Sequence, residues 1–496
     1  MNINLKTILV IALFLIGFSS CNAVKEDAPV DQEENNEEGN KDVHVYLTTA
    51  DRQHEFVKSY VDLKEGSSMS PKTISLDEDE KFQKMDGFGA ALTGSTCFNL
   101  MQMQESDRKE FLTKTFSKDK GMGQSYVRIS IGCSDFSLSE YTLADEPGIE
   151  NFALQEEETK YVIPILKEVL AINPDVKIMG SPWTAPRWMK VDNLENKNPY
   201  NSWTGGHLNP AYYQDYATYF VKWIKAMDEN GVPIYSITPQ NEPLNDKNSA
   251  SMVMTWQEQT NFIKEALGPE LESNGIETKI YVFDHNYNYD NMNDQMQYPL
   301  KIYEDKEAEK YVAGAAYHNY GGDKAELMHV HEQAPDKELV FTETSIGTWN
   351  DGHNLEKRLI EDMEEIGLGT LNNWSKGVIV WNLMLDENRG PNREKGCKTC
   401  YGAVDIGNDY KTLQKNSHYF VTGHLSSVIQ PDAVRIGATG FSNPDIIYTA
   451  FKNPDDSYSI VLLNKGGETH RINVSNKEKY FAYDLPSKSV ASFKWK

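Results

Sequence analysis

Two glutamates stand where a carboxylate could take part in catalysis. Glu242 follows the apolar segment 234–237, and Glu343 follows the apolar segment 338–342. A single glutamate after an apolar strand is more often a solvated strand end. Two carboxylates that meet across one cleft can cleave a glycosidic bond, because the leaving oxygen needs a proton and the sugar carbon needs an electron-rich partner. The chemistry therefore depends on whether the fold brings both glutamates to one cleft.

The elements that must position them alternate along the chain from residue 80 onward. Short β-rich segments are separated by segments of helical period, which is typical of parallel strands with helical crossovers. Eight such repeats predict a (β/α)8 barrel of the α/β class, whose active site lies at the carboxyl ends of its strands. Glu242 would follow the fourth strand and Glu343 the seventh. The predicted strands are 85–90, 125–131, 176–180, 234–238, 279–283, 314–318, 338–342 and 377–381, and helices are predicted over 157–171, 210–229 and 255–273.

Further polar and aromatic residues follow the predicted strands at the same end. Each of them has a structural alternative: a histidine or tryptophan can be a core residue, and an arginine can be a buried ion-pair partner. Their shared position favours a site for a sugar, with tryptophans that suit the apolar face of a ring. These residues are Arg128 within the second strand, Asp135 after it, Trp183 after the third, Asn241 beside Glu242, His318 and Tyr320 at the sixth, and Trp381 at the eighth.

The two carboxylates need different protonation states to act as a pair. We expect burial and neighbouring negative charge to raise the pKa of the carboxyl group that acts as the acid. We expect donors such as Arg128, His318 and Tyr320 to keep the nucleophile ionised. Asn241 could bind the sugar 2-hydroxyl, a contact that strengthens as charge develops at the anomeric carbon.

Outside the barrel the pattern changes to short alternating strands. Segments 446–451 and 458–463 are predicted to form a hairpin, and 488–495 a closing strand. The strand 43–48 has no helix after it and is predicted to join this C-terminal sheet. We therefore expect a composite β-sandwich domain. Its predicted parts are an N-terminal segment 43–80 and a C-terminal segment 426–496, with the barrel over 81–425.

The N-terminus has the features of an export signal. Lys6 precedes an apolar run over 8–16 that is too short to span a bilayer, and small residues follow it. Residues 1–20 are predicted to be a signal peptide, and Cys21 resembles the acylated cysteine of bacterial lipoproteins. The acidic stretch 21–42 has little to bury and is predicted to be a tether. We expect a lipid-anchored protein of the outer membrane or cell surface, with a periplasmic location as the alternative.

Composition and cysteines limit the partners further. A net charge of -25 and a pI near 4.9 argue against nucleic acid as a partner. Cys397 and Cys400 could form a redox pair, half a zinc site or a disulfide. A second Cys-x-x-Cys pair is absent from the sequence, and export favours a disulfide. The redox states of Cys97 and Cys133 and the oligomeric state stay open.

An ordered set of motifs resembles glycoside hydrolase family 30 over about residues 43–496. The resemblance implies that Glu242 is the acid/base, that Glu343 is the nucleophile, and that no metal or organic cofactor takes part. It also implies a sugar subsite lined by Asp135, Trp183, Asn241 and Trp381, with Arg128, His318 and Tyr320 as support. The motifs are Gln83–Thr93, Tyr126–Ser137, Gly180–Met189, Gln240–Pro243, His318–Tyr320, Phe341–Glu343 and Val380–Leu383.

The loop after the eighth strand bears on substrate choice. Asn392, in Gly390–Asn392, matches an asparagine that the glucosylceramidase branch of the family places at its site, whereas the continuation 393–400 looks more like β-1,6-glucanases. We therefore expect a retaining endo-β-1,6-glucanase acting on a β-glucan. A glucosylceramidase or exo-β-glucosidase is the alternative, and a non-catalytic surface glycan-binding lipoprotein is the alternative of another class.

Overall fold

The computed structural model describes residues 42–287 and 293–496. The predicted signal peptide, Cys21 and all of the predicted tether except Asp42 lie outside the described residues. Within the described part of the chain, no helix combines the length and apolar character needed to cross a membrane.

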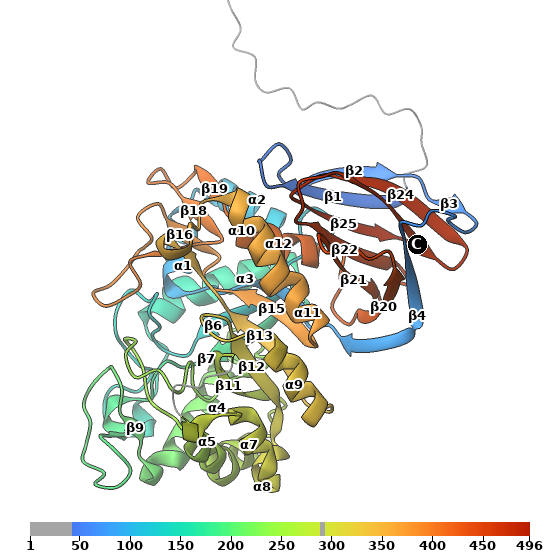
Figure 1. Cartoon of the computed structure of the whole chain (residues 1–496). Helices are drawn as coiled ribbons and strands as arrows, with labels where there is room; N and C mark the ends of the chain where they lie inside the picture. Colours follow the sequence, from blue (N-terminus) through green and yellow to red (C-terminus); the bar gives the residue numbers. More distant parts are fainter. Residues whose placement is uncertain (1–41, 288–292) are drawn as a thin grey trace, which may run out of the picture. The chain divides into compact units, whose positions relative to one another are not determined.

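Eight parallel strands form the barrel (Figure 1). Their order is β5-β15-β13-β12-β11-β10-β7-β6, and the two end strands meet through a parallel bridge between Ala91 and Arg128. The sheet therefore closes, which confirms the predicted fold class. The strands are β5 (Gly87–Ala90), β6 (Tyr126–Ser130), β7 (Lys177–Ser181), β10 (Ser236–Ile237), β11 (Lys279–Asn286), β12 (Val312–His318), β13 (Glu338–Glu343) and β15 (Ser375–Val380).

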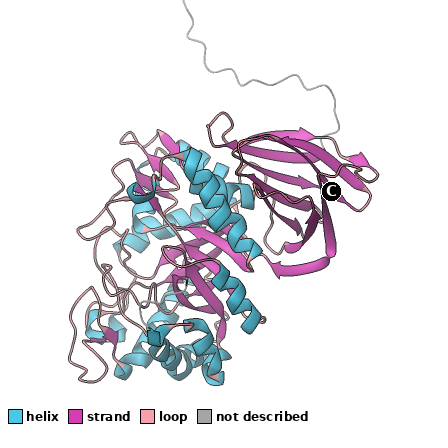
Figure 2. Ribbon diagram, in the orientation of Figure 1, coloured by secondary structure: helices cyan, strands magenta, loops and turns pink. Residues whose placement is uncertain are grey.

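Helices follow the barrel strands, as Figure 2 shows. Trp223 of α4 is fully buried against β7, where Gly180 leaves room for its ring. Thr255 and Glu258 form a capping box at the start of α5. The helices are α1 (Gly94–Gln102), α2 (Glu105–Phe116), α3 (Ile163–Ile172), α4 (Tyr213–Glu229), α5 (Trp256–Phe262), α6 (Gly268–Ser273), α7 (Tyr298–Glu304), α8 (Lys306–Glu309), α9 (Ala325–Gln333), α10 (Leu355–Asp362), α11 (Leu368–Asn372) and α12 (Ser417–Ser426).

The predicted helices 157–171 and 255–273 are composite. A π-helical turn, Glu158–Val162, precedes α3, and a second one, Ile263–Leu267, joins α5 to α6. Such turns add one residue to the helical repeat and rotate the apolar face that follows.

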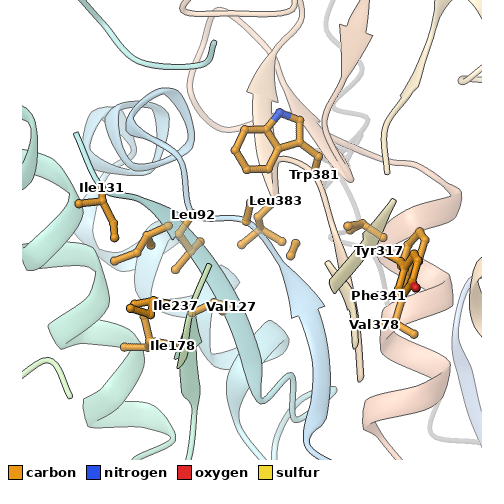
Figure 3. Close-up of a cluster of buried hydrophobic side chains, with 14 of the residues drawn as sticks. Leu92, Val127, Ile131, Ile178, Ile237, Tyr317, Phe341, Val378, Trp381 and Leu383 are labelled. Atoms are coloured by element: carbon orange, nitrogen blue, oxygen red, sulfur yellow. The ribbon is translucent and has the colours of Figure 1, made fainter. Parts of the chain in front are cut away.

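The interior of the barrel is filled by apolar side chains of alternate strand positions. They form a separate buried cluster of Tyr126, Met179, Tyr281, Ala316, Val340 and Ile379. The intervening positions Val127, Ile178, Ile237, Phe341 and Val378 belong to the larger core that includes the surrounding helices (Figure 3). Ion pairs lie at the other, amino-terminal end of the strands, where Glu338 binds both Lys279 and Lys376, and Asp86 binds Lys177. These ion pairs stabilise the amino-terminal end of the barrel, and the active site of such a barrel lies at the carboxyl end of its strands.

A second sheet, of ten strands, forms the β domain. Its order is β2-β1-β25-β22-β21-β20-β4-β23-β24-β3, and β1 pairs antiparallel with β25, so the N-terminal strand joins the C-terminal sheet as predicted. Its apolar core includes Val45, Ile460 and Phe493. The strands are β1 (Val43–Thr49), β2 (Val57–Val61), β3 (Lys64–Glu65), β4 (Thr73–Lys84), β20 (Val434–Gly440), β21 (Ile446–Lys452), β22 (Tyr458–Asn464), β23 (His470–Asn476), β24 (Lys479–Leu485) and β25 (Ser489–Trp495).

Short strands pair with one another in the loops. One of them, β14, lies in the loop after β13 and pairs antiparallel with β17, which begins at Cys400. The short strands are β8 (Lys190–Val191), β9 (His207–Leu208), β14 (Ile346–Gly347), β16 (Met384–Asp386), β17 (Cys400–Tyr401), β18 (Val404–Ile406) and β19 (Leu413–Lys415).

Candidate active site

Glu242 and Glu343 face one another. One carboxylate oxygen of each, together with a ring nitrogen of His318, lies within 4.8 Å of the others. Each glutamate is only 6% exposed. Carboxylates at about 5 to 5.5 Å are arranged for a retaining reaction, in which one attacks the sugar carbon directly. The structure thus brings the two predicted residues together at the carboxyl end of the barrel.

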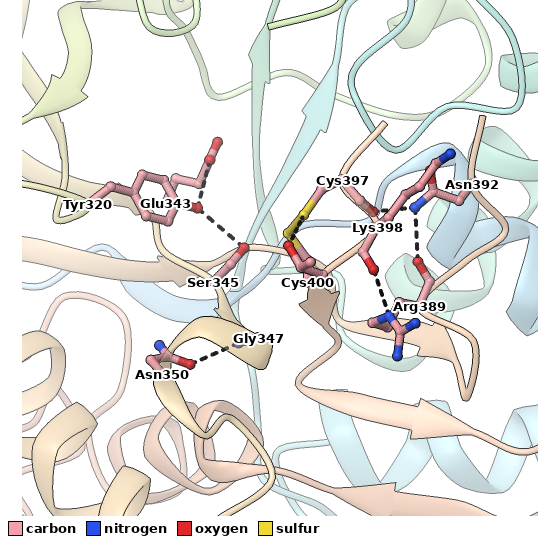
Figure 4. Close-up of a disulfide and its surroundings, with 11 residues drawn as sticks. Tyr320, Glu343, Ser345, Gly347, Asn350, Arg389, Asn392, Cys397, Lys398 and Cys400 are labelled. Carbon is pink, nitrogen blue, oxygen red and sulfur yellow. Dashed lines mark hydrogen bonds between the residues drawn. A yellow bond between two sulfur atoms is a disulfide. The ribbon is translucent and has the colours of Figure 1, made fainter. Parts of the chain in front are cut away.

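Glu343, at the end of β13, is held by two donors. Arg128 Nη1 donates to Oε2 at 2.5 Å, and the Tyr320 hydroxyl donates to Oε1 at 3.0 Å. Figure 4 shows Tyr320 reaching Glu343, with Ser345 beside the same hydroxyl. Arg128 is fully buried. Donors of this kind favour the ionised carboxylate and fix its orientation.

Glu242 is held by a different set of groups. The side-chain amides of Asn245 and Asn248 donate to Oε2 at 2.7 and 3.0 Å, and His318 Nδ1 lies 3.3 Å from Oε1. The backbone of Glu242 has a φ of 45°, in the left-handed region that costs a non-glycine residue free energy. Its backbone N–H donates to the carbonyl of Asp284. The surrounding contacts therefore impose a strained turn that aims this carboxylate at Glu343.

A third buried carboxylate, Asp284 on β11, binds the groups that support the other two. Its Oδ1 accepts from His318 Nε2 at 3.0 Å and from the Thr342 hydroxyl at 2.7 Å. Its Oδ2 accepts from Arg128 Nη2 at 2.7 Å and from the hydroxyls of Ser181 and Thr238, both at 2.8 Å. Asp284 is fully buried. It thus joins residues from β6, β7, β12 and β13 and the residue after β10.

The pKa shifts differ from the expected pattern. Burial acts to raise the pKa of Glu242, but the hydrogen bond with His318 and the amide of Asn245 bring it down to about 2. Burial raises the pKa of Glu343, with help from the charges of Glu242 and Asp284 and against His318 and Arg128. The expectation of a raised pKa at Glu242 is therefore wrong for the free site. The physical reason is His318, whose charge Asp284 stabilises.

The two predicted tryptophans form a buried floor. The rings of Trp183 and Trp381 stack with centroids 5.1 Å apart, and each is 2% exposed. The Arg128 guanidinium lies over both rings, at 5.0 and 5.5 Å from their centroids. Asn241 accepts from Arg128 through its Oδ1 at 2.7 Å, which leaves its NH₂ group as the donor for a ligand.

The comparisons with known proteins agree with this geometry. The glycosyl hydrolase family 30 TIM-barrel domain matches residues 85–429, and the beta sandwich domain of the same family matches residues 432–493. The chain belongs to glycoside hydrolase family 30. It is therefore a retaining glycoside hydrolase.

Relatives of this family 30 chain differ in their substrates. An endo-1,6-beta-D-glucanase of Trichoderma harzianum is 30% identical over 452 residues, which cover 86% of this chain and 88% of the relative. Lysosomal acid glucosylceramidase of Mus musculus is 27% identical over 451 residues, covering 85% and 83%. The solved structure of the endo-beta1,6-glucanase BT3312 is 60% identical, has a TM-score of 0.90, and covers 92% of this chain and 99% of that chain.

Asp135 and Asn392 differ in their burial and in their hydrogen-bond partners in this family 30 site. Asp135 Oδ1 is buried and has no hydrogen-bond partner among the described residues. Burial raises the pKa of Asp135 to about 7, with Glu343 and Glu242 adding to the rise. Asn392, in contrast, is exposed and donates its amide to the carbonyls of Arg389 and Cys397 within its own loop (Figure 4). The structure therefore brings Asp135 into the site and turns the Asn392 amide into the loop.

Cys397 and Cys400 form a disulfide, which agrees with the preferred interpretation of this pair (Figure 4). Cys97 and Cys133 are buried free thiols. The disulfide loop pairs with the loop after β13 through Thr348, whose N–H donates to the carbonyl of Thr399 at 2.9 Å. The loop is thereby tied to the segment that follows Glu343.

Glu242, His318 and Glu343 also have the spacing of a metal-ligand set. A metal-ligating histidine must be neutral. Here the neighbouring carboxylates outweigh burial and raise the pKa of His318 to about 9, which favours the imidazolium, and its two ring nitrogens face Asp284 and Glu242. The cation of Arg128 bound to Glu343 further opposes a metal ion. This donor set therefore fits a proton network better than a metal.

Sequence reasoning missed Asp284, Asn245 and Asn248. The fifth predicted strand ended at Phe283, and Asp284 follows it directly. The rule that selected Glu242 and Glu343 would have selected Asp284 as well. Asn245 and Asn248 had a weaker signal, since they lie in a loop after Pro243 whose course the sequence does not determine.

Proposed function

We propose that this family 30 enzyme is an endo-β-1,6-glucanase that cleaves β-1,6-linked glucan with retention of configuration. The observation that carries the proposal is the 60% identity, across 92% of the chain, with a solved endo-β-1,6-glucanase. The fungal endo-1,6-β-glucanase at 30% identity supports the same linkage.

In the proposed reaction Glu343 is the nucleophile and Glu242 the acid/base. Glu343 attacks the anomeric carbon while Glu242 protonates the departing oxygen, and a covalent glycosyl enzyme forms. Water then attacks this intermediate, and Glu242 takes the proton. The bonds from Arg128 and Tyr320 hold Glu343 in its ionised form before attack. The NH₂ group of Asn241 and the unpaired oxygen of Asp135 are the proposed contacts to sugar hydroxyls.

Four substrates separate the candidate activities. Purified enzyme is incubated with a β-1,6-glucan, glucosylceramide, xylan and an aryl β-glucoside, and the products are resolved by size. Release of a ladder of oligosaccharides from the β-1,6-glucan supports the proposal. Activity confined to glucosylceramide would assign the enzyme to the activity of its mouse relative, and release of glucose alone would indicate exo action.

Two variants test the proposed roles. Glu343→Ala should abolish turnover without unfolding the barrel, because Arg128 keeps Asn241 and Asp284 as partners. Glu242→Ala should accumulate glycosyl enzyme from substrates with good leaving groups, and added azide should yield a β-glycosyl azide. Full turnover by Glu343→Ala, or an α-glycosyl azide from Glu242→Ala, would overturn these roles.

We also propose that the protein is an exported lipoprotein anchored through Cys21. The support is the order Lys6, the apolar run 8–16 and Cys21 after small residues. Mass spectrometry of the membrane-extracted protein should find a diacylglyceryl group on an N-terminal Cys21. Cys21→Ala should release the protein from the membrane fraction, and an unmodified, soluble wild-type protein would refute the proposal. Protease treatment of intact cells distinguishes the cell surface from the periplasm.

A further inference from the structure

We propose that His318, held by Asp284, stores the proton that Glu242 delivers to the leaving group. Asp284 is then a positioning residue of the glycosidase reaction. The inference rests on the family's glycosidase activity and on the acid/base role of Glu242, and it is independent of the linkage that the enzyme cleaves.

The three side chains form a continuous line. Asp284 Oδ1 lies 3.0 Å from His318 Nε2, and His318 Nδ1 lies 3.3 Å from Glu242 Oε1. Asp284 and His318 are fully buried, and Glu242 is 6% exposed. An imidazole between two carboxylates can donate from both nitrogens only when it carries two protons. The geometry therefore suits an imidazolium whose second proton faces Glu242.

Asp284 stays ionised because its oxygens are saturated with donors. Arg128 and the hydroxyls of Ser181, Thr238 and Thr342 all donate to it in addition to His318. A carboxylate that accepts so many hydrogen bonds strongly favours its charged form. The proton of this network is therefore kept off Asp284 and on the imidazole.

Charged and titratable groups face His318 from several strands. Asp284 comes from β11 and Glu242 from the segment after β10, while Glu343 comes from β13. The ring of His285 lies 6.5 Å away, and that of Tyr320 lies 6.2 Å away. Burial acts against charge on His318, but Glu343, Asp284 and Glu242 outweigh it, and the pKa of His318 rises to about 9.

The proton balance of the first step follows. Glu242 begins the step as a carboxylate. As the bond between the anomeric carbon and the glycosidic oxygen breaks and Glu343 bonds to the carbon, Glu242 accepts the Nδ1 proton of His318 and passes a proton to the leaving oxygen, so that it ends the step as a carboxylate. His318 is then neutral. In the second step water loses a proton to Glu242 as its oxygen bonds to the carbon, and this proton returns to Nδ1. One proton enters with the water and one leaves with the alcohol, so the cycle closes.

A proton held on His318 explains how Glu242 can act as an acid although the free site stabilises its carboxylate. Asn245 and Asn248 both donate to Glu242 Oε2, which stabilises the carboxylate rather than the acid. A general acid in that state needs a neighbouring donor when charge develops on the leaving oxygen. Of the three described side chains that bind the Glu242 carboxylate, those of Asn245, Asn248 and His318, the His318 imidazolium is the one that can supply a proton.

The test uses a leaving-group series, because only proton delivery depends on the leaving group. The sugar is one that the wild-type enzyme hydrolyses, and the aglycones range from dinitrophenol to a simple alcohol. The value of kcat/KM reports the glycosylation step. His318→Gln should lower kcat/KM for the alkyl glycoside at least tenfold more than for the dinitrophenyl glycoside. An equal loss on both substrates would show a merely structural role and overturn the proposal.

The pH profile provides the second readout. Asp284→Asn should move the alkaline limb of kcat/KM for the alkyl glycoside to lower pH by at least one unit, because the imidazolium loses its counter-ion. Thr342→Val is the matched control, since it removes a neutral donor to the same Asp284 oxygen and should leave the limb in place. An unmoved limb in a folded Asp284→Asn protein would overturn the proposal, and if that variant does not fold, His318→Gln decides.

These outcomes are separate from the proposed linkage. A wild-type enzyme that ignores β-1,6-glucan but hydrolyses another glycoside would reject the proposed function, and the leaving-group series on that glycoside would still test His318.

Discussion

Replacement of Arg128 by methionine tests whether charge balance holds the buried site together. Arg128 donates through Nη1 to Glu343 and through Nη2 to Asn241 and Asp284. Methionine keeps an apolar stem that can pack on Trp183 but removes the charge and every donor. Two buried carboxylates thereby lose their shared cation.

The magnitude follows from the burial of these groups. Loss of one partner from a buried ion pair leaves an uncompensated charge and costs about 3 to 5 kcal/mol. We expect the lower end, about 3 kcal/mol, because Asp284 keeps the hydroxyl donors of Ser181, Thr238 and Thr342. The thermal midpoint should fall by several degrees at neutral pH.

The effect should depend on pH with a definite sign. Burial acts to raise the pKa of Asp284, but Arg128 first and then His318 and Thr342 hold it well below its ordinary value. A carboxyl group with a depressed pKa in the folded state contributes stability above its unfolded pKa, and this stability is lost as pH falls. The difference in the free energy of unfolding between wild type and Arg128→Met should therefore be largest above about pH 5 and should decrease below about pH 4.

Thermal melts of both proteins across this range provide the assay. Arg128→Lys is the control: its single ammonium keeps a charge but cannot bridge the acceptors that the guanidinium fork reaches. It should recover part of the stability, while kcat/KM stays low because Glu343 is no longer oriented. A gap below about 1 kcal/mol at neutral pH, or one that does not change in acid, would refute the reasoning.

Three further substitutions test the barrel, the disulfide and the mouth. Gly180→Ala should destabilise the fold by about 1 to 3 kcal/mol in denaturant titrations, because its Cβ would lie 2.2 Å from the Trp223 ring, whereas Gly467→Ala, with open space around it, should have no such cost. Cys397→Ser should cost about 2 kcal/mol or less, because the disulfide closes only a short loop. It should raise KM for the polymer. Trp349, 52% exposed in the loop after Glu343, should bind a distant sugar ring, so Trp349→Ala should raise KM about fivefold for long chains and leave an aryl glucoside unaffected.

The architecture could be predicted because it depends on local patterns. Each barrel strand is a short apolar run bounded by helical segments, and each of the eight runs overlaps an observed strand. The fourth is shorter than predicted, since Thr238 and Pro239 end β10 after Ile237. The strand ends then determined where Glu242 and Glu343 lie, because the carboxyl ends of parallel strands meet at one mouth.

The contacts within the active site were less predictable, because they form between side chains of different strands and loops. Trp183 and Trp381 follow strands as a ligand platform would, yet they stack against each other beneath Arg128. Asn392 has the right residue type, but its loop uses the amide for its own carbonyls. Residue identity at a strand end does not reveal which neighbour takes the hydrogen bond.

The balance of charge explains why the pKa pattern escaped prediction. Two carboxylates in one buried cleft repel each other, and a third, Asp284, would seem to add to that cost. Asp284 instead binds Arg128 and His318, and so holds one cation against Glu343 and another against Glu242. The site therefore carries nearly matched charges, which lets both glutamates remain ionisable while only 6% exposed. The side chain of Asp284 thus acts on both glutamates through the two cations that it binds, and pairwise reasoning from Glu242 and Glu343 alone could not have found it.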